Sequence, residues 1–392
     1  VIDPYTGNVV AMAGAIGEKT GSRLFNYATA RRQCGSAIKP ISVYAPALDK
    51  GVITPASVID DAPVRALGGK AWPVNSHSYF DGLVSVDEAI AESLNTCAVR
   101  VVEELGVKES YNYMTDKLGF TTLVSDTDNP KQNDINSASM GLGGLTRGVS
   151  TVEMAAAYAA FVNQGVYNEP RTYSKVTDQD GKTVIDNTGD SWGAMKETTA
   201  YFMNKYLRQV VTSGTGGSAG FSGMTVAGKT GTTTDNYDRY FVGYTPYYVA
   251  AVWTGYEVNV KINASGNPSA KLFRQVMSKI HANLPNKSFF SVDSGLTSVK
   301  VCMDCGNLAS DLCAQDIRGS RVKTVEVASG TAPAAVCTCH VAVDWCAEGE
   351  AIATEFCPAD QVVQKSAVDY TRSGVAASVG CRDESSHLAA LQ

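Results

Sequence analysis

Three short motifs, far apart in this sequence, have to meet if the chain carries the chemistry that they indicate. They are Ser36-Ala37-Ile38-Lys39, then Ser93-Leu94-Asn95, then Lys229-Thr230-Gly231-Thr232. Together they supply a nucleophilic hydroxyl, two amines, an amide and a strand that can bind a carboxylate. The fold must therefore bring these three segments to one site.

Each motif also occurs a second time, so the triplets alone decide nothing. The second copies are Ser320-Arg321-Val322-Lys323, Ser265-Gly266-Asn267 and Lys19-Thr20-Gly21. The first lies in a Cys-rich tail without a helical apolar stripe, the second has turn composition, and the third lies in a polar stretch with no strand pattern before it. We therefore predict that these copies are loop segments without a role in the chemistry.

Helices are expected around the first two motifs. The apolar residues of 37–48 predict a buried helix with Ser36 at its amino end, where backbone N–H groups are free. Capping boxes, Ser85 with Glu88 and Ser150 with Glu153, predict helices over 86–92 and 151–163. A further helix is expected over 96–105.

Strands are expected at both ends of the first 260 or so residues. Residues 1–16 read as a hairpin, and strands are predicted over 224–228, 240–244 and 248–253. Strands at the ends with helices between them predict a mixed α/β fold, in which helices pack on an antiparallel sheet.

Two domains are expected, 1–284 and 285–392, because a Pro-Asn-Lys linker starts at Pro285 and the cysteines crowd into the tail. Disulfides are the favoured interpretation of this tail and imply an oxidising compartment. Zinc stays open, since Cys302-x-x-Cys305 has ligand spacing, but Cys337-x-Cys339 is a poor second half. The tail cysteines are Cys302, Cys305, Cys313, Cys337, Cys339, Cys346, Cys357 and Cys381.

Charge and hydropathy exclude some classes of function. The net charge of -6 and pI near 5.4 argue against a nucleic-acid partner. No apolar run is long enough to span a membrane. The chain opens without Met on a strand-like segment, so we expect a signal, anchor or partner domain upstream.

The spacing of the motif residues predicts how they act. Lys39 lies one helical turn after Ser36 and can remove its proton if burial and a second cation, Lys229, destabilise the ammonium. The hydroxyl of Ser93 can relay the proton, and the amide of Asn95 can hold both a bound peptide and the lysine.

The third motif predicts a carboxylate receptor. Thr230 and Thr232 point to one side of a strand, next to the charge of Lys229. Gly231 lets a substrate backbone lie close to the strand edge. The backbone N–H groups of Thr232 and Ser36 are expected to form an oxyanion hole.

Three further residues are candidates for contact with substrate. Trp72 and Tyr79 precede the Ser93 motif and either line the cleft or pack under the loop. Thr234 follows the third motif and is expected to touch ligand. The sequence predicts no cofactor and no metal in this chemistry.

The residues around the motifs resemble the penicillin-binding transpeptidases of the class A, bifunctional type. The run 31–40 is similar to that family's nucleophile signature, and 227–233 with 239–246 is similar to its third motif and the following strand. The remaining matching segments are 2–7, 143–149, 153–158 and 330–333. The resemblance covers residues 1 to about 340.

The resemblance implies a serine β-lactamase/penicillin-binding-protein-like sheet with helices on both sides. It implies a D,D-transpeptidase that crosslinks peptidoglycan stem peptides through a Ser36 acyl-enzyme and is acylated by β-lactams. It also implies an extracellular site of action, a missing membrane anchor and glycosyltransferase domain, and partners in cell-wall synthesis. A carboxypeptidase or β-lactamase-type hydrolase and a non-catalytic sensor are the alternatives.

Two cysteines depart from the family pattern, which commonly has proline at both positions. Cys34 lies two residues before the nucleophile and Cys97 two residues after Asn95. Since the two motifs must meet, one hypothesis is a disulfide between them. The other is a pair of small buried thiols.

Overall fold

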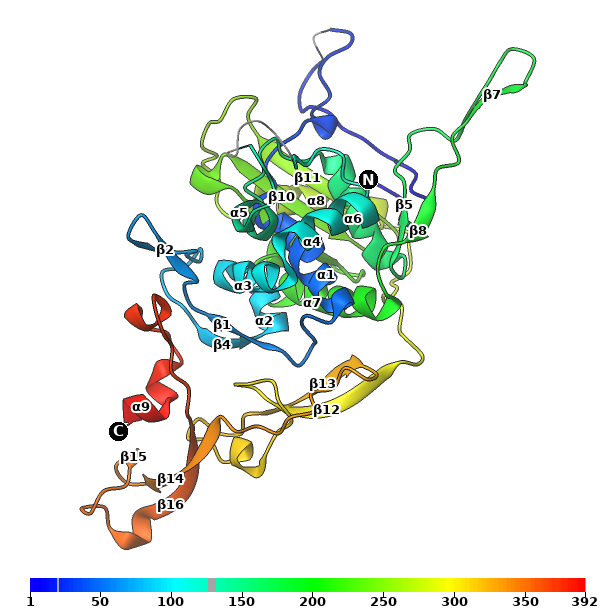
Figure 1. The fold of residues 1–392 in the computed structure, drawn as a ribbon. Coiled ribbons are helices and arrows are strands. Elements are labelled where there is room, and N and C mark those ends of the chain that lie inside the picture. Colours follow the sequence, from blue (N-terminus) through cyan, green and yellow to red (C-terminus); the bar gives the residue numbers. More distant parts are fainter. Residues whose placement is uncertain (20, 126–131, 392) are drawn as a thin grey trace. The chain divides into compact units, whose positions relative to one another are not determined.

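The computed structural model describes residues 1–19, 21–125 and 132–391 (Figure 1). It divides into two compact units. Unit 1 comprises Val1–Val52, Ile90–Ser93 and Val101–Asp293, and unit 2 comprises Ile53–Ala89, Leu94–Arg100 and Ser294–Gln392. Thr20, the middle residue of the second Lys-Thr-Gly motif, lies outside the described residues.

Unit 1 is built on a three-stranded antiparallel sheet with the order β11-β10-β9. In its central strand, Val242 lies opposite Lys229 on one side and Ala251 on the other. The strands are β9 (Ala227–Thr232), β10 (Asp238–Tyr244) and β11 (Val249–Gly255).

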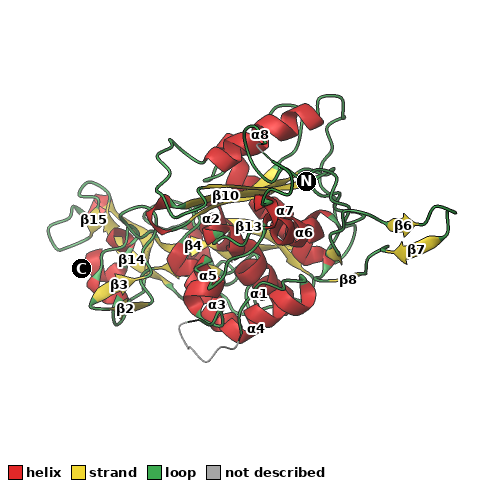
Figure 2. Ribbon diagram, turned by 90° about the horizontal axis from the view of Figure 1, so that it is seen from above, coloured by secondary structure: helices red, strands yellow, loops and turns green. Residues whose placement is uncertain are grey.

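Helices cover both faces of this sheet (Figure 2). Phe241 of β10 packs on Phe273 of helix α8 (Pro268–Ile280), with ring centroids 4.9 Å apart. Tyr244, three residues along the same strand and so on its opposite face, packs on Tyr158 of α6 (Thr151–Val162) at 6.4 Å. The predicted antiparallel sheet with helices on both sides is confirmed.

The segment that carries the first motif is helical but not one α-helix. A 3-10 turn (Gly35–Ile38) leads into a π-helical turn (Pro40–Tyr44) and then into α1 (Ala45–Lys50), which ends at Gly51 with φ of 75°. Pro40 and Pro46 lack the amide hydrogen that a continuous α-helix would use, which accounts for the irregular start.

The predicted capping box at Ser150 is present, since its side chain and that of Glu153 bond each other's backbone. The predicted hairpin in 1–16 is reduced to single bridges, in which Ile2 pairs with Val9 and with Val249. The other helices that lie wholly or partly in unit 1 are α2 (Val86–Ala91), α3 (Asn95–Leu105), α4 (Val107–Asn112), α5 (Ser137–Leu142) and α7 (Glu197–Thr212).

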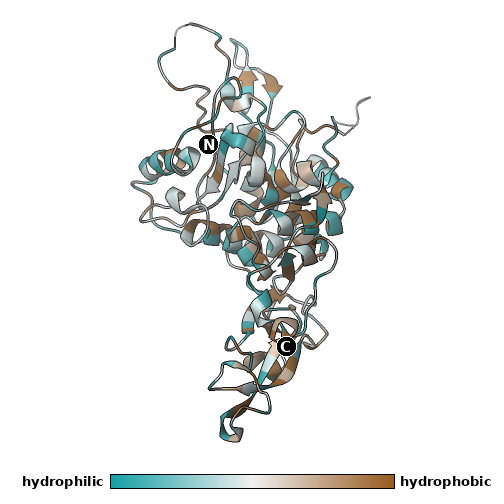
Figure 3. Cartoon of the chain, turned by 90° about the vertical axis from the view of Figure 1, so that its left-hand side faces the viewer, coloured by the Kyte–Doolittle hydropathy of each residue, from teal (hydrophilic) through white to brown (hydrophobic). Residues whose placement is uncertain are grey.

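Outside the central sheet, the strands in the described part of unit 1 form short pairs. Apolar and hydrophilic stretches alternate along several helices of unit 1 (Figure 3), as expected for helices that present one face to a core, whereas α6 is buried from Met154 to Val162. The strands are β5 (Val166–Asn168), which pairs with β8 (Ser191–Gly193), and β6 (Lys175–Thr177), which pairs with β7 (Thr183–Asp186).

The described residues of unit 2 form small antiparallel sheets, parts of α2 and α3, and one short helix near the end of the chain. The sheets are β1 (Val58–Asp61) with β4 (Gly82–Ser85), β2 (Arg65–Leu67) with β3 (Lys70–Trp72), β12 (Leu296–Cys302) with β13 (Val322–Ala328), and β14 (His340–Cys346) with β15 (Ala351–Ile352) and β16 (Val362–Val368), followed by α9 (Leu388–Leu391).

Within unit 2, ion pairs hold the end of the chain against the paired strands β1 and β4. The guanidinium of Arg372 lies 2.8 Å from Asp60 and 3.0 Å from Asp383. Asp383 also accepts the backbone N–H of Leu83 at 3.0 Å. Hydrogen bonds from His387, Leu83 and Arg372 outweigh burial and lower the pKa of Asp383 to about 2, so this carboxylate stays charged at neutral pH.

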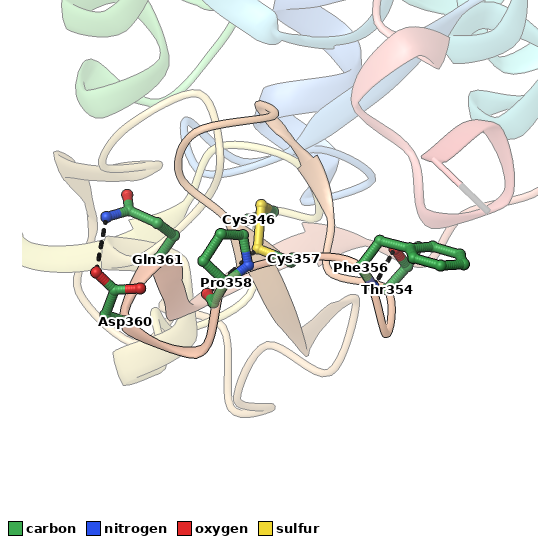
Figure 4. Close-up of a disulfide and its surroundings, with 7 residues drawn as sticks. All are labelled: Cys346, Thr354, Phe356, Cys357, Pro358, Asp360 and Gln361. Carbon is green, nitrogen blue, oxygen red and sulfur yellow. Dashed lines mark hydrogen bonds between the residues drawn. A yellow bond between two sulfur atoms is a disulfide. The ribbon is translucent and has the colours of Figure 1, made fainter.

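One disulfide is present among the described residues, Cys346–Cys357 near the end of β14 (Figure 4). Cys34 and Cys97 are not joined to each other in the structure. The side chains of both cysteines are completely buried, and the hydroxyl of Thr96 lies 3.9 Å from the sulfur of Cys97. Among the residues described, no helix has the length and apolar character needed to cross a bilayer.

Candidate active site

Ser36 lies near the start of the irregular helical segment and is half-buried, whereas its neighbours Ala37, Ile38 and Lys39 are fully buried. The hydroxyl of Tyr158 on α6 donates a hydrogen bond of 2.6 Å to the carbonyl of Ala37. This bond holds the turn that carries Ser36 against the core of unit 1.

The nucleophile turn packs directly on strand β9, and two glycines make this contact possible. A Cβ on Gly35, whose φ is 52°, would lie 2.4 Å from the carbonyl oxygen of Thr232. A Cβ on Gly231 would lie 2.0 Å from the carbonyl oxygen of Cys34. Any side chain at either position would force the two segments apart, so glycine places Ser36 next to the end of the third motif.

Lys39 links the first motif to the second. Its side chain is fully buried, and its ammonium donates a hydrogen bond of 2.8 Å to the carbonyl oxygen of Ser93. Ser93 lies between α2 and α3 with a φ of 60°, a conformation that is rare for a residue other than glycine. The left-handed turn is what directs this carbonyl to the lysine.

Lys229 on β9 is the second buried lysine of the site. Burial lowers its pKa from 10.5 to about 7, and the carboxylate of Glu92 opposes this shift only weakly. An amine with this pKa can exist in both the charged and the neutral form near neutral pH.

The threonines of the third motif have partners that the sequence did not indicate. The hydroxyl of Thr230 lies 3.1 Å from that of Thr215, and the hydroxyl of Thr232 accepts a bond of 2.9 Å from the guanidinium of Arg239. Thr215 precedes the strand in the chain, and Arg239 follows on β10, opposite Thr232. Thr234 begins an exposed 3-10 turn (Thr234–Asn236).

Within unit 2, Asn95 is held by a hydrogen-bond network that no local pattern revealed. Its backbone N–H donates to the side chain of Asn75 at 2.7 Å, and its own amide donates to the carbonyl of Val74 at 2.7 Å. Asn75 in turn donates to Asp61 at 2.7 Å. Asp61 is completely buried and also accepts a hydrogen bond from the hydroxyl of Thr96. Its carboxylate therefore orders the start of α3.

The two aromatic candidates also lie in unit 2 and both make packing contacts there. The guanidinium of Arg65 lies 5.3 Å from the ring centroid of Trp72. Tyr79 stacks on His77 at 4.0 Å, and the guanidinium of Arg382 lies 4.6 Å from the centroid of the Tyr79 ring. Tyr79 remains 42% exposed despite these contacts.

Two of the second motif copies make structural contacts, but the prediction of a loop is wrong at Lys323, which lies in strand β13. Lys323 forms an ion pair of 3.0 Å with Asp87. Asn267 caps helix α8, because its side chain accepts from the backbone N–H groups of Ser269 and Ala270.

The sequence matches two family profiles. Residues 1–278 match the penicillin binding protein transpeptidase domain, and residues 292–342 match the C-terminal domain of penicillin-binding protein 1A. The chain therefore belongs to the penicillin-binding protein transpeptidase family, and its features are those of the class A type.

Relatives and solved structures agree with this family. The chain is 34% identical to penicillin-binding protein 1A of Clostridium perfringens over 357 residues, which are 87% of this chain and 41% of that protein. It is 32% identical to penicillin-binding protein 1F of Bacillus subtilis over 287 residues, which are 71% of this chain and 38% of that protein. The chain thus spans less than half the length of these relatives.

The fold resembles two solved structures at lower sequence identity. Penicillin-binding protein 1A from Haemophilus influenzae has a TM-score of 0.64 at 22% identity, over 80% of this chain and 50% of that one. The PonA1 protein from Mycobacterium tuberculosis, in complex with penicillin V, has a TM-score of 0.61 at 24% identity, over 75% of this chain and 80% of that one.

Proposed function

We propose that residues 1–284 form a D,D-transpeptidase domain that crosslinks peptidoglycan stem peptides through an acyl-enzyme on Ser36. The observation that carries the proposal is the pair of buried lysines near an accessible serine. Lys39 is bonded to Ser93 at 2.8 Å, and Lys229 lies on the strand that packs against the Ser36 turn. Residues 285–392 would form a Cys-rich extension.

In this proposal the Ser36 hydroxyl attacks the carbonyl between the two terminal D-alanines of a stem peptide. Lys39, in its neutral form, takes the hydroxyl proton as the bond to carbon forms. The backbone N–H groups of Ser36 and Thr232 stabilise the oxyanion of the tetrahedral intermediate. The hydroxyl of Ser93 passes a proton to the departing D-alanine amine, and Asn95 holds the peptide.

The acyl group then moves to an amine of a second stem peptide, which regenerates the Ser36 hydroxyl and leaves a crosslink. The charge of Lys229 and the hydroxyls of Thr230 and Thr232 bind the terminal carboxylate of the donor. A β-lactam carries a carboxylate and a strained amide in the same relation, so it acylates Ser36 in place of the donor. Gly231 and Thr234 border the strand along which either ligand lies.

The reaction would take place on the outer face of the bacterial cytoplasmic membrane, where stem peptides are found. The parent protein would carry a membrane anchor and a glycosyltransferase domain, as the class A resemblance implies. Proteins of cell-wall synthesis would then be its partners.

Labelling with a fluorescent penicillin tests the nucleophile. The native chain should take up about one label, and Ser36→Ala should take up none. Ser320→Ala is the matched control, because Ser320 opens the second Ser-x-x-Lys motif, and it should label like the native chain. Absence of label on the native chain would contradict the proposal that the chain is an acyl-enzyme-forming transpeptidase. Label on Ser36→Ala would contradict the assignment of Ser36 as the nucleophile.

A second assay separates transfer from hydrolysis. A donor peptide ending in D-Ala-D-Ala is supplied together with an excess of an acceptor peptide amine, and the products are separated by mass. A transpeptidase releases one D-alanine for each crosslinked product. Release of D-alanine with only the shortened donor as product would instead identify a carboxypeptidase.

A further inference from the structure

Five cysteines and one histidine of the C-terminal region gather around one point of unit 2. They are Cys302, Cys305, Cys313, Cys337, Cys339 and His340. Two sets of four among them have all their ligand atoms within 4.8 Å of one another. We propose that one of these sets, Cys302, Cys313, Cys337 and His340, binds a structural zinc ion.

The distances within this set are those of ligands around a tetrahedral ion. The Nδ1 atom of His340 lies 3.4 Å from the sulfur of Cys302 and 3.4 Å from the sulfur of Cys337. With Zn–S of about 2.3 Å and Zn–N of about 2.0 Å, neighbouring ligand atoms of a tetrahedron are about 3.5–3.8 Å apart. All four side chains are buried, as in a closed structural site.

The imidazole of His340 is oriented as a zinc ligand. Its Nε2 lies 3.0 Å from a carboxylate oxygen of Asp316, which is completely buried. The N–H on Nε2 therefore donates to this carboxylate, which leaves the lone pair of Nδ1 facing the sulfurs. A carboxylate behind a ligating histidine fixes its tautomer and its orientation in many zinc sites.

The nearby carboxylates are neutralised by arginines and so are not the ligands. Asp304 lies 2.9 Å from the guanidinium of Arg318 and 2.8 Å from that of Arg321. Asp316 lies 2.7 Å from Arg318. Since the two arginines offset the two carboxylates, it is the sulfurs, once deprotonated, that require a cation.

Backbone N–H groups are directed at two of the sulfurs. The N–H of Asp304 donates to Cys302 at 3.4 Å, and the N–H of Ser310 donates to Cys313 at 3.4 Å. Such bonds stabilise a thiolate more than a neutral thiol, since hydrogen bonds to a charged group are the stronger ones. They are the expected second layer around zinc-bound cysteines.

Disulfides account less well for this cluster. The sulfurs of Cys337 and Cys339 lie 3.5 Å apart, whereas bonded sulfurs lie about 2.05 Å apart. The same region does form the Cys346–Cys357 disulfide. The Cys337-x-Cys339 spacing argues against zinc only if Cys302 and Cys305 form the other half of the site. That pairing leaves out His340, which is a ligand in the set proposed here.

The interior of this region gives the ion a structural role. The buried cluster consists of Cys302, Cys313 and Cys337, and its partly buried neighbours are small, among them Ala309 and Val322. A core with so few large apolar groups gains little from burial alone. Zinc ligation would supply that folding free energy, and the region would depend on the metal.

The test is the zinc content of the whole chain, purified under reducing conditions with zinc chloride and then dialysed. We expect one zinc ion per chain. Cys313→Ser and His340→Gln should each lower the affinity for zinc by about tenfold or more. Two matched controls, Cys381→Ser outside the cluster and Cys305→Ser from the other set, should retain the ion.

Two further measurements keep the proposal testable if a variant folds poorly. Cobalt loaded into the native chain should give the sulfur-to-metal absorption and the intense visible bands of a tetrahedral thiolate site. After denaturation with a chelator, the eight cysteines outside Cys346–Cys357 should all react as thiols.

Three outcomes would overturn the proposal. Chains that hold no zinc, with fewer reactive thiols than expected, would show that the cluster forms disulfides. Loss of zinc in Cys305→Ser but not in Cys313→Ser would assign the ion to the four-cysteine set. Two zinc ions per chain, with each of these two variants losing one, would contradict a single site.

Discussion

The ammonium of Lys39 donates a hydrogen bond of 2.8 Å to the carbonyl oxygen of Ser93. This bond joins two motifs that are more than fifty residues apart in the chain. It requires the left-handed backbone of Ser93, whose φ is 60°. The lysine is thereby fixed in one position, buried and one turn after Ser36, as a general base must be.

We predict that Lys39→Met slows acylation by a penicillin by about 10²–10⁴-fold, the range that loss of a general base usually costs. The second-order rate constant of labelling is the measurement. Lys50→Met is the matched control, because Lys50 lies at the end of α1 and pairs with Glu109 at 2.7 Å on the surface. An equal loss in both variants would show that the effect of Lys39→Met is structural.

Gly231→Ala should separate strand β9 from the nucleophile turn. Its new Cβ would lie 2.0 Å from the carbonyl oxygen of Cys34, which is a backbone atom and cannot turn away. We expect a loss of about 1–3 kcal/mol in the free energy of unfolding, together with slower acylation. Chemical denaturation and labelling kinetics measure the two effects.

Gly193→Ala is the control for this substitution. Gly193 also lies in a strand of unit 1, but a Cβ there meets no atom within 4 Å. Its unfolding free energy and its labelling rate should match those of the native chain. If Gly231→Ala also had the unfolding free energy and labelling rate of the native chain, the result would contradict the close contact between β9 and the nucleophile turn.

Asn75→Ala should disturb the start of α3. The substitution removes the acceptor of the Asn95 N–H and a donor to the buried carboxylate of Asp61. Leaving buried polar groups without partners costs about 1–3 kcal/mol. Thermal unfolding measures the cost, and Asn187→Ala, which removes one exposed bond to Tyr173, should cost far less.

The sequence predicted those parts of the fold that depend on neighbours in the chain. The capping box of Ser150 and Glu153 lies within one helical turn, and the helix that it opens is present. Local context distinguished the site motifs from their copies, and Asn267 does lie at a turn into α8, whereas Lys323 lies in strand β13 and not in the expected loop.

Contacts between distant residues were not predictable in this way. Asp61, Asn75 and Asn95 form one network although nothing in their local sequences relates them. The proposed zinc set was missed for the same reason, because Cys313 lies in a 3-10 turn (Asp311–Ala314) and His340 begins strand β14. The packing of the Ser36 turn against β9, which Gly35 and Gly231 allow, was likewise not predictable from a helical pattern.

The pH dependence of acylation should report the charge of Lys229. Burial lowers its pKa to about 7, so the fraction of charged amine in the free protein falls as the pH rises above this value. Since a penicillin carries a carboxylate, its second-order rate constant should decline on this alkaline side. Lys229→Arg stays charged and should not show the decline. A native profile that is flat above pH 7 would contradict the role of this charge.

The same shift makes stability depend on pH. The pKa of Lys229 is about 7 in the folded protein and 10.5 when unperturbed, so between these values the unfolded chain binds the extra proton. The unfolding free energy should therefore rise with pH across this window and be lowest below pH 7. Denaturant titrations of native chain and Lys229→Met, at several pH values, should show the native chain gaining stability relative to the variant as the pH rises. A constant difference between the two would show that this lysine is not buried with a lowered pKa.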